Sequence, residues 1–499
     1  MHVPPSTSPA SSHVASSSSS TRAPRGAWLP LVAALLLAGC ASTASLAPSA
    51  EAPARFKEAS VARATDAAPS TATATATATG TAATPAPVAG DWWRAFADPA
   101  LDALVERAAT RNTDIRQAAA RLAEARALAR SVDAARAVQV DAGGGANRAA
   151  GLGRTVDGRP VTLLDARVGV SYELDLFGRL AGASNAAVLD ADARAALLES
   201  ARLIVQAEVA QRYFQLRAID AERSLVRDTV AAYRDTLDLT ERRERAGDLA
   251  ELDVERVRTE LAATESDALA LDRQRALLEH ALAVLTGEGA TDFDLAADAW
   301  TTALPSIPAG VPSTVLVRRP DVAAAQRTVM AAQERLGVAR TAWFPSIALT
   351  GAGGFASPDL GDLFKWSARS WGIGALLSLP LLDGGRREAG VQVAAAQLDG
   401  ARERYRDQVL VAFREVEDEL ASLRLLDRQS VVQARAVDSA ARATALSDVR
   451  YRNGMVSQLE LLDARRSELR NRRQALQVRA ARYQSTVGLI RALGGAWDA

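Results

Sequence analysis

Two stretches of the chain alternate between apolar residues and polar or small ones, a pattern that predicts β-strands with one apolar face. They run from Val168 to Leu176 and from Ser370 to Leu381. Weaker alternation from about Val138 to Ala146 and from Pro345 to Phe355 predicts a partner strand before each of them. Because turn-forming Gly, Asp and Pro residues occur in both connecting segments, we expect each pair to form a β-hairpin.

After each predicted hairpin the chain carries a long segment without proline and with little glycine. The first runs from Arg179 to Gly247 and the second from Arg386 to Gly454. At about 1.5 Å per residue, each segment predicts a helix of about 100 Å that ends at a capping glycine. A second helix then returns to about Leu285 or Arg491, so we expect two antiparallel helix hairpins.

The second helix hairpin has an apolar seam of the coiled-coil type, in which residues step by four and three. On the first arm the seam residues are Val409, Phe413, Val416, Leu420 and Leu423. On the return arm they are Leu459, Leu462, Leu469, Leu476, Tyr483, Val487 and Ile490. Arg466 and Arg473 interrupt the return seam, which otherwise predicts knobs-into-holes contact between the arms.

The two halves of the chain repeat at a constant offset of 207 residues, without a gap. The offset takes Trp93 to Trp300, Arg111 to Arg318, Asp114 to Asp321, Gly247 to Gly454 and Leu252 to Leu459. Such regularity indicates an internal duplication, and we divide the body into a first repeat, 91–297, and a second repeat, 298–499. The first repeat opens with short helices predicted over Ala100–Thr110 and Asp114–Ala135.

Four strands in one chain leave two unpaired sheet edges, which a membrane does not tolerate. Single-chain barrels begin at about eight strands, so closure in lipid requires several chains. Two copies would give a barrel with a filled interior, and three would give twelve strands and room for a lumen. The alternative is a soluble sandwich with one hydrated face.

The single cysteine, Cys40, follows a segment typical of an export signal. Arg22 and Arg25 precede an apolar stretch from Trp28 to Ala38, which is too short to span a bilayer. Leu37-Ala38-Gly39-Cys40 resembles a bacterial lipobox, which implies a signal peptide over 1–39 and acylation of Cys40. Several acyl chains anchor a protein stably, and the absence of Asp at position 41 favours the outer membrane. The alternative is an ordinary cleaved signal with an incidental cysteine.

Residues 40–90 contain mainly Ala, Ser, Thr and Pro. Because few large apolar side chains are present to offset chain entropy, we predict a disordered tether between the lipid and the body.

The composition offers little for catalysis or nucleic-acid binding. Lys and Arg together equal Asp and Glu at 59 each, so no net positive charge recommends nucleic acid as a partner. Of three histidines, only His280 remains after the signal, and no free thiol remains. We therefore expect neither an enzyme nor a metal site, and no cofactor except the covalent lipid on Cys40.

Several motifs together resemble the TolC-like outer-membrane efflux proteins, specifically the lipoprotein subfamily of resistance-nodulation-division (RND) systems (NodT/OprM-like). Besides the lipobox, the resemblance rests on Asp91-Trp92-Trp93, Asp98-Pro99-Ala100-Leu101, Tyr172-Glu173-Leu174-Asp175-Leu176-Phe177-Gly178-Arg179, Arg319-Pro320-Asp321-Val322, Trp343-Phe344-Pro345-Ser346-Ile347 and Tyr451-Arg452-Asn453-Gly454. It extends from Asp91 to Gly495.

The resemblance implies an α+β fold in which three copies form a 12-stranded outer-membrane barrel continued by a periplasmic helical tunnel. It also implies a passive export channel, supplied by an inner-membrane RND pump. A periplasmic adaptor would contact the hairpin tips around Gly247 and Gly454.

The same resemblance implies a periplasmic gate formed by Arg450, Tyr451, Leu459 and Asp463. Three copies of Leu459 would make an apolar constriction, and three of Asp463 an acidic ring that attracts cations. Leu459 also fits the heptad, so a simple coiled-coil core position remains the alternative. Where many relatives have an acidic residue after the turn, this chain has Val456, which puts a polar latch there in doubt.

Two other functions remain open: a type I secretion duct, and a periplasmic coiled-coil structural lipoprotein that forms no channel. Lipid-facing strands would distinguish a duct from the structural protein.

Overall fold

The computed structural model describes residues 55–58, 91–149, 160–308, 310 and 312–496, all within one compact unit, 46–499. The predicted signal peptide, Cys40 and most of the predicted tether lie outside the described residues. Among the helices that are described, none is both long and apolar enough to cross a bilayer.

The first repeat forms a short 3-10 helix, four α-helices and two strands. They are η1 (Trp92–Phe96), α3 (Pro99–Arg111), α4 (Thr113–Ala134), β1 (Gln139–Ala149), β2 (Val161–Leu174), α5 (Arg179–Arg245) and α6 (Glu251–Leu285). The second repeat follows the same order. It contains α7 (Pro312–Arg318), α8 (Pro320–Thr341), β3 (Ser346–Ser357), η2 (Leu360–Asp362), η3 (Trp366–Ala368), β4 (Arg369–Ser378), α9 (Arg386–Arg452) and α10 (Gln458–Ala492).

The duplication extends to the ends of the long helices. Helices α5 and α9 both have 67 residues, and α6 and α10 both have 35. Helices α9 and α10 begin 207 residues after their counterparts α5 and α6, as Arg386 follows Arg179. The predicted α+β fold of duplicated helix, β-hairpin and long helix hairpin is therefore confirmed.

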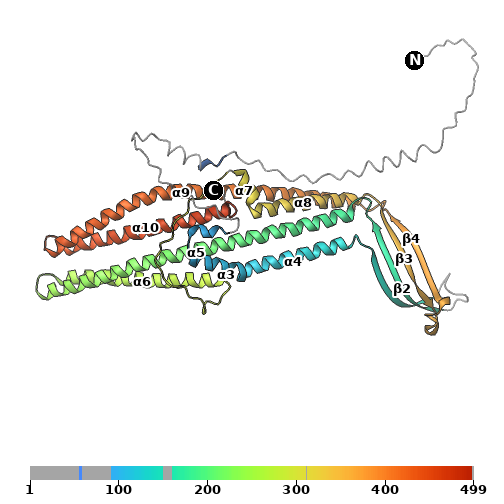
Figure 1. Cartoon of the computed structure of the whole chain (residues 1–499), viewed down its shortest axis with the longest axis horizontal. Helices are drawn as coiled ribbons and strands as arrows, with labels where there is room; N and C mark the ends of the chain where they lie inside the picture. The colour runs from blue at the N-terminus through green and yellow to red at the C-terminus, as the bar shows by residue number, and fades with distance from the viewer. Residues whose placement is uncertain (1–54, 59–90, 150–159, 309, 311, 497–499) are drawn as a thin grey trace, which may run out of the picture. The chain divides into compact units, whose positions relative to one another are not determined.

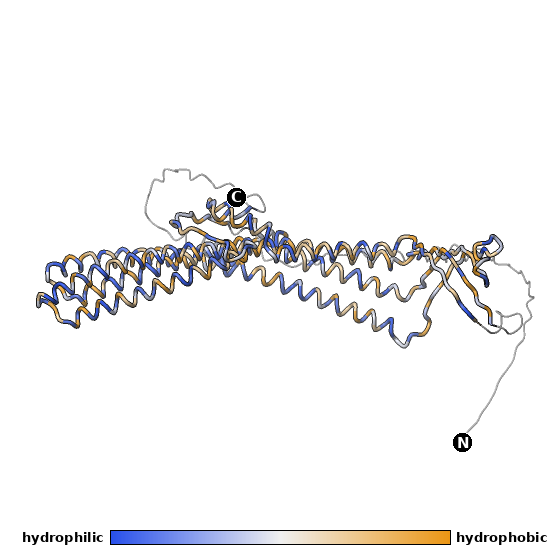
Figure 2. The backbone as a smooth tube through the Cα atoms, turned by 90° about the horizontal axis from the view of Figure 1, so that it is seen from below, coloured by the Kyte–Doolittle hydropathy of each residue, from blue (hydrophilic) through white to orange (hydrophobic). Residues whose placement is uncertain are grey.

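Helices α5 and α9 run from the sheet to the hairpin tips (Figure 1). Near the sheet they lie beside α4 and α8, and farther on they pair with α6 and α10. Figure 2 shows hydrophobic and hydrophilic residues interspersed along these helices, as expected when narrow apolar stripes bury each helix against its neighbours.

All four strands form one antiparallel sheet in the order β1-β2-β3-β4. The predicted hairpins are present, and β2 also pairs with β3, from Leu174 opposite Ile347 to Leu164 opposite Ser357. This pairing joins the two repeats. Predicted strand residues Leu176 and Leu379 to Leu381 lie beyond the observed ends of β2 and β4. Within the described chain, β1 and β4 each have a paired neighbour on one side only.

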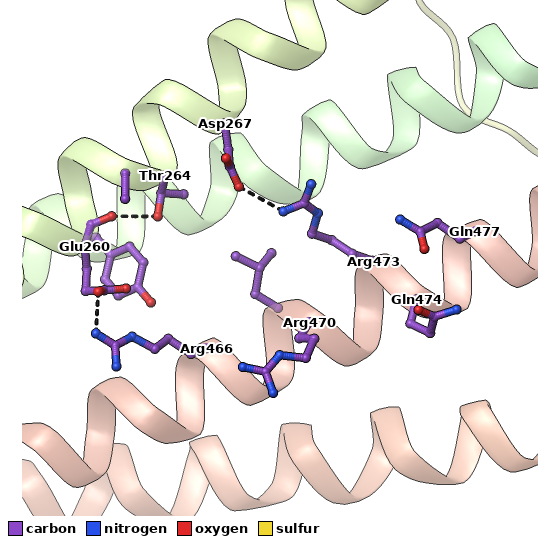
Figure 3. A pocket seen from close by; sticks show the side chains of 11 residues that line it. Glu260, Thr264, Asp267, Arg466, Arg470, Arg473, Gln474 and Gln477 are labelled. Atoms are coloured by element: carbon purple, nitrogen blue, oxygen red, sulfur yellow. Dashed lines mark hydrogen bonds and ion pairs between the residues drawn. The ribbon is translucent and has the colours of Figure 1, made fainter.

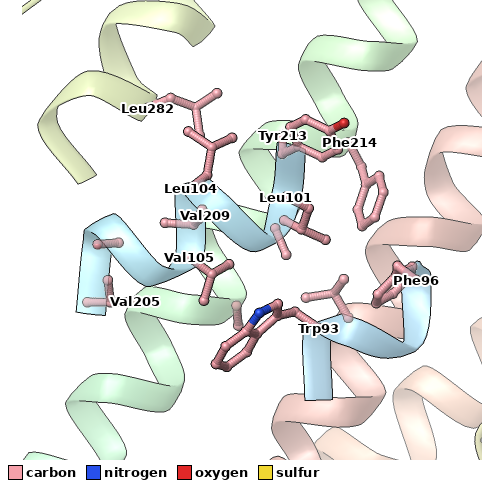
Figure 4. Packing of buried hydrophobic residues seen from close by; sticks show 14 of the residues in the cluster. Trp93, Phe96, Leu101, Leu104, Val105, Val205, Val209, Tyr213, Phe214 and Leu282 are labelled. Atoms are coloured by element: carbon pink, nitrogen blue, oxygen red, sulfur yellow. The ribbon is translucent and has the colours of Figure 1, made fainter. Parts of the chain in front are cut away.

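The largest hydrophobic core lies where η1 and α3 cross α5 (Figure 4). Phe96 and Phe214 have ring centroids 4.9 Å apart, and Phe214 and Tyr483 of α10 have centroids 4.7 Å apart. Asp98 caps α3 by accepting hydrogen bonds from the backbone of Ala100 and Leu101. The capped helix α3 therefore holds this core against the middle of the long helices.

A second junction shows how the repeats diverged. The side-chain amide of Asn112 donates to the carbonyl of Leu285 at 2.9 Å, and the guanidinium of Arg319 donates to the carbonyl of Ala492 at 3.1 Å. The two contacts are related by the 207-residue offset. Arg319 additionally pairs with Asp321 and Glu415, because its charge needs partners where Asn112 needs none.

The prediction of disorder throughout 40–90 is wrong for residues 55–58. Phe56 is only 2% exposed and belongs to a cluster with Val416 of α9 and Leu489 of α10. One aromatic residue with a matching site is enough to fix a short segment that composition alone assigns to a tether.

Gly287 follows α6 with a φ of 72°, and a Cβ there would lie 2.6 Å from the carbonyl oxygen of Arg111. We expect Gly287→Ala to lower the unfolding temperature more than Gly247→Ala, measured in detergent. Gly247 has a similar φ of 84° but open space around its Cβ position, so its substitution costs only about 1–2 kcal/mol of backbone strain. Equal effects of both substitutions would contradict close approach at Gly287.

Candidate gate at the tips of the helix hairpins

Each helix hairpin turns through a glycine. Gly247 and Gly454 have φ of 84° and 70°, values that non-glycine residues rarely adopt. The backbone N–H of Asp248 donates to the carbonyl of Arg243, and that of Met455 donates to the carbonyl of Arg450, at 2.9 and 2.8 Å. These bonds satisfy carbonyls at the ends of α5 and α9, so the predicted capping role of both glycines is confirmed.

The two tips contact each other through Tyr451. Its ring lies under the guanidinium of Arg243, 5.0 Å from the carbon of that group, and the residue is buried. Arg243 also donates to the carbonyl of Arg452 at 3.4 Å. The hydroxyl of Tyr451 has no hydrogen-bond partner among the described residues. Tyr451 therefore joins the first hairpin to the second mainly through its ring.

Leu459 does not occupy the coiled-coil core. It is 43% exposed, whereas Leu461 and Leu462 beside it are fully buried. The predicted place of Leu459 in the apolar seam is therefore wrong. Gln458, Leu461 and Leu462 are the residues that face inward at the start of α10. The side chain of Leu459 is left free for contact with another molecule or another copy.

The remaining predicted gate residues carry charges near the same turn. Arg450 lies 3.6 Å from Glu460, which links the two arms of the second hairpin, and both side chains are about half exposed. Asp463 pairs with Arg466 one helical turn later at 3.2 Å and is also largely exposed. The structure thus gathers Arg450, Leu459 and Asp463 at the accessible end of the second hairpin, with Tyr451 buried beside them.

Below the tips, neutral and charged hydrogen bonds connect α10 to the first hairpin. The amide of Gln458 donates to the hydroxyl of Thr240 at 2.9 Å, and both residues are buried. Arg465 donates to the carbonyl of Ala232 at 3.0 Å and also pairs with Asp448 at 3.1 Å. Val456 is half-buried at the turn and has no polar side chain, so the first buried polar side-chain link between the hairpins is that of Gln458.

An open-sided hollow of about 380 Å³ lies between α6 and α10 (Figure 3). Arg466 forms an ion pair with Glu260 at one end, and this hydrogen bond raises the pKa of Arg466 above its usual value. Farther along, Arg473 binds Glu222 of α5 at 2.6 Å and Asp267 of α6 at 2.9 Å. Arg466 and Arg473 therefore bridge the two hairpins.

In the sequence, these two arginines stand out only as interruptions of the heptad. Their position within an apolar seam was the available signal, since a charge at such a position needs a partner on a facing helix. The partners themselves lie about 200 residues away, and no local pattern identifies them.

We expect Arg466→Ala to destabilise the protein by about 1 kcal/mol, because it leaves the mostly buried Glu260 without its cation. Arg470→Ala is the matched control, since Arg470 lines the same hollow and has no ion pair among the described residues. Thermal unfolding in detergent measures both, and the exchange Arg466→Glu with Glu260→Arg should recover stability. Equal effects of the two alanine variants would contradict the bridge.

Comparison with known proteins agrees with this geometry. A family model described as outer membrane efflux protein matches residues 104–288 and 311–495, once in each repeat. The chain is 33% identical over 474 residues to the solvent efflux pump outer membrane protein SrpC of Pseudomonas putida, covering 94% of this chain and 98% of that protein. It is 31% identical over 410 residues to the cation efflux system protein CusC of Escherichia coli, covering 82% and 88%.

The fold is also similar to that of the solved outer-membrane channel OprN. The TM-score is 0.80 at 28% identity, over 91% of this chain and 99% of that one. The family consists of transport channels rather than enzymes. The chain therefore belongs to the outer membrane efflux protein family and is an efflux channel of the outer membrane that extends into the periplasm.

Proposed function

We propose that three copies of this chain form the passive outer-membrane duct of a tripartite efflux pump. The observation that carries the proposal is the four-stranded sheet with an unpaired edge on β1 and another on β4. Joining β4 of one copy to β1 of the next satisfies both edges, and three copies give twelve strands with a lumen. The family fold supports this arrangement over the soluble sandwich.

Exposed side chains of the sheet favour lipid on its outer face. Trp371 and Ile373 of β4 are 78% and 84% exposed in the single chain, although both are large and apolar. Their neighbours Gly372 and Gly374 lie on the other face of β4. An apolar outer face and a small-residue inner face are what a membrane barrel with a lumen requires.

The duct has no catalytic role in this proposal and moves what the pump delivers. SrpC is named for solvent efflux and CusC for cation efflux, although both resemble this chain to a similar degree. The pump and adaptor therefore select the compound. The partners would be an inner-membrane RND pump, a periplasmic adaptor at the tips around Gly247 and Gly454, and lipid attached to Cys40.

The gate of this duct would be the end of the second hairpin. The exposed position of Leu459 suits contact with its copies across a threefold axis, and Asp463 suits an acidic ring next to them. Arg450 and Tyr451 would hold the ring, the first through Glu460 and the second through Arg243. A type I secretion duct would share the barrel, and an adjacent gene for an RND pump would favour efflux over secretion.

A test of assembly is the mass of the purified protein. We expect a trimer that needs detergent to remain in solution, because the unpaired strand edges and the exposed Trp371 and Ile373 have no cover in a single chain. Light scattering with correction for bound detergent gives the mass. A monomer that is soluble in water would overturn the channel and favour the structural lipoprotein.

A test of the gate is conductance in a planar bilayer. We expect Leu459→Ala and Asp463→Ala each to raise single-channel conductance severalfold, because each removes part of the constriction. Leu252→Ala is the matched control, since Leu252 is the equivalent residue of the first hairpin and is 60% exposed. Unchanged conductance in both second-hairpin variants would remove the gate assignment and leave the duct proposal standing.

A further inference from the structure

The segment Arg55–Glu58, which we call the leader segment, lies against the second repeat although it precedes both repeats in sequence. Phe56 is buried with Val315 of α7, Val416 of α9, and Leu489 and Ala492 of α10. Its ring centroid is 6.4 Å from that of Phe413, in an edge-to-face arrangement. Burial of an aromatic side chain among apolar neighbours favours docking of the segment.

Polar contacts fix the same segment. The carboxylate of Glu417 on α9 accepts hydrogen bonds from the backbone N–H groups of Lys57 and Glu58, at 2.6 and 3.0 Å. The carboxylate of Glu58 binds the guanidinium of Arg424 at 2.6 Å. Residues 57 and 58 are helical, so Glu417 satisfies two N–H groups that the start of a helix leaves without intrahelical partners.

Comparison of the two repeats explains why a site exists there. In the first repeat, α3 has 13 residues, and Leu101, Leu104 and Val105 from its first turns enter the core (Figure 4). Its counterpart α7 has only 7 residues and begins at Pro312, the position equivalent to Val105. Residues 306–308 and 310, at positions equivalent to the first turns of α3, are described and are not helical.

The positions that α3 covers are nevertheless kept apolar in the second repeat. Val209 and Leu282 pack with α3 in the first repeat, and the 207-residue offset takes them to Val416 and Leu489. Both of these residues are fully buried, and Phe56 is in their cluster. The leader segment therefore occupies the region left open by the short α7.

The polar neighbours of this site follow the same relation. Arg217 is buried in the first repeat and donates to the carbonyl of Ala296 at 2.8 Å. Its equivalent in the second repeat is Arg424, whose partner is Glu58 of the leader segment. The first repeat thus makes both contacts within itself, the apolar one with α3 and the polar one through Arg217. In the second repeat the leader segment supplies both, through Phe56 and Glu58.

We propose that the leader segment is a structural part of the second repeat, replacing the first turns of the helix that α7 lacks. Its docking site is the surface of α7, α9 and α10 around Phe413, Val416, Glu417 and Arg424. The site lies about 30 to 40 residues, or about 45 to 60 Å, along α9 from Gly454. Docking thereby ties the N-terminal part of the chain to the base of the hairpin that carries the proposed gate.

The chain permits a direct test with a lysine-specific protease. Its only lysines are Lys57, in the leader segment, and Lys365, between η2 and η3. Glu417 accepts hydrogen bonds from the N–H groups of Lys57 and Glu58, which keeps the bond between these residues in helical geometry. A protease binds its substrate as an extended strand. We expect the full chain in detergent to be cut slowly after Lys57, with Lys365 as the internal reference.

Phe413→Ala and Glu417→Ala should each speed cleavage after Lys57 at least tenfold and leave cleavage after Lys365 unchanged. Both changes lie on α9, so the sequence around the scissile bond stays intact. Asp418→Ala is the matched control, because Asp418 is exposed on the same helix and, among the described residues, forms an ion pair only with Arg414, at 3.9 Å. Cleavage tracks the undocked population when docking is fast relative to cutting.

Exchange of charge gives a second readout. Arg424→Glu should also speed cleavage after Lys57, and the double variant Arg424→Glu with Glu58→Arg should be cut slowly again. Because Glu58 follows the scissile bond, each cleavage rate is divided by the rate of the same variant in its unfolded state. Cleavage of the unaltered protein after Lys57 at its unfolded rate would overturn the proposal, as would unchanged rates in the Phe413 and Glu417 variants. The test does not involve conductance or trimer mass, so its result is independent of the proposed channel.

Discussion

The unpaired edges of the four-stranded sheet are the constraint on which the rest of the structure depends. Backbone groups in the long helices bond within each helix, so α5 and α9 can extend far from any core without cost in hydrogen bonds. The free edges of β1 and β4 have no such internal solution. In the proposed trimer, the strands are therefore the part that must join other copies. The long helices are complete without a neighbour, which leaves their tips free for the proposed adaptor.

Duplication supplied this architecture twice, but the copies are not equivalent. Asn112 and Arg319 occupy equivalent positions, yet only Arg319 pairs with carboxylates, those of Asp321 and Glu415. The shortened α7 exposes an apolar region that α3 covers in the first repeat, and Phe56 buries it. In both cases a change in one repeat is accommodated by a contact that its counterpart does not make.

Periodicity predicted the elements well because each long helix and hairpin is decided by residues close in sequence. The ends of α5 and α9 followed from Gly247 and Gly454. The pairing of β2 with β3 and the docking of Phe56 join segments far apart, and no local pattern encodes them. The seam position predicted for Leu459 failed for a related reason: the heptad allows either register at a helix start, and burial of Gln458 against Thr240 decides between them.

The contacts between the hairpins differ in how water and salt act on them. The Arg466–Glu260 and Arg473–Asp267 pairs include partly exposed side chains, so salt screens them and each contributes little. The hydrogen bond from Gln458 to Thr240 is neutral and buried, and Leu462 packs with Tyr233 and Val257. Screening therefore loosens the edge of the interface before its centre. Near the tips, relative movement of the hairpins must break the buried contacts of Gln458 and Leu462.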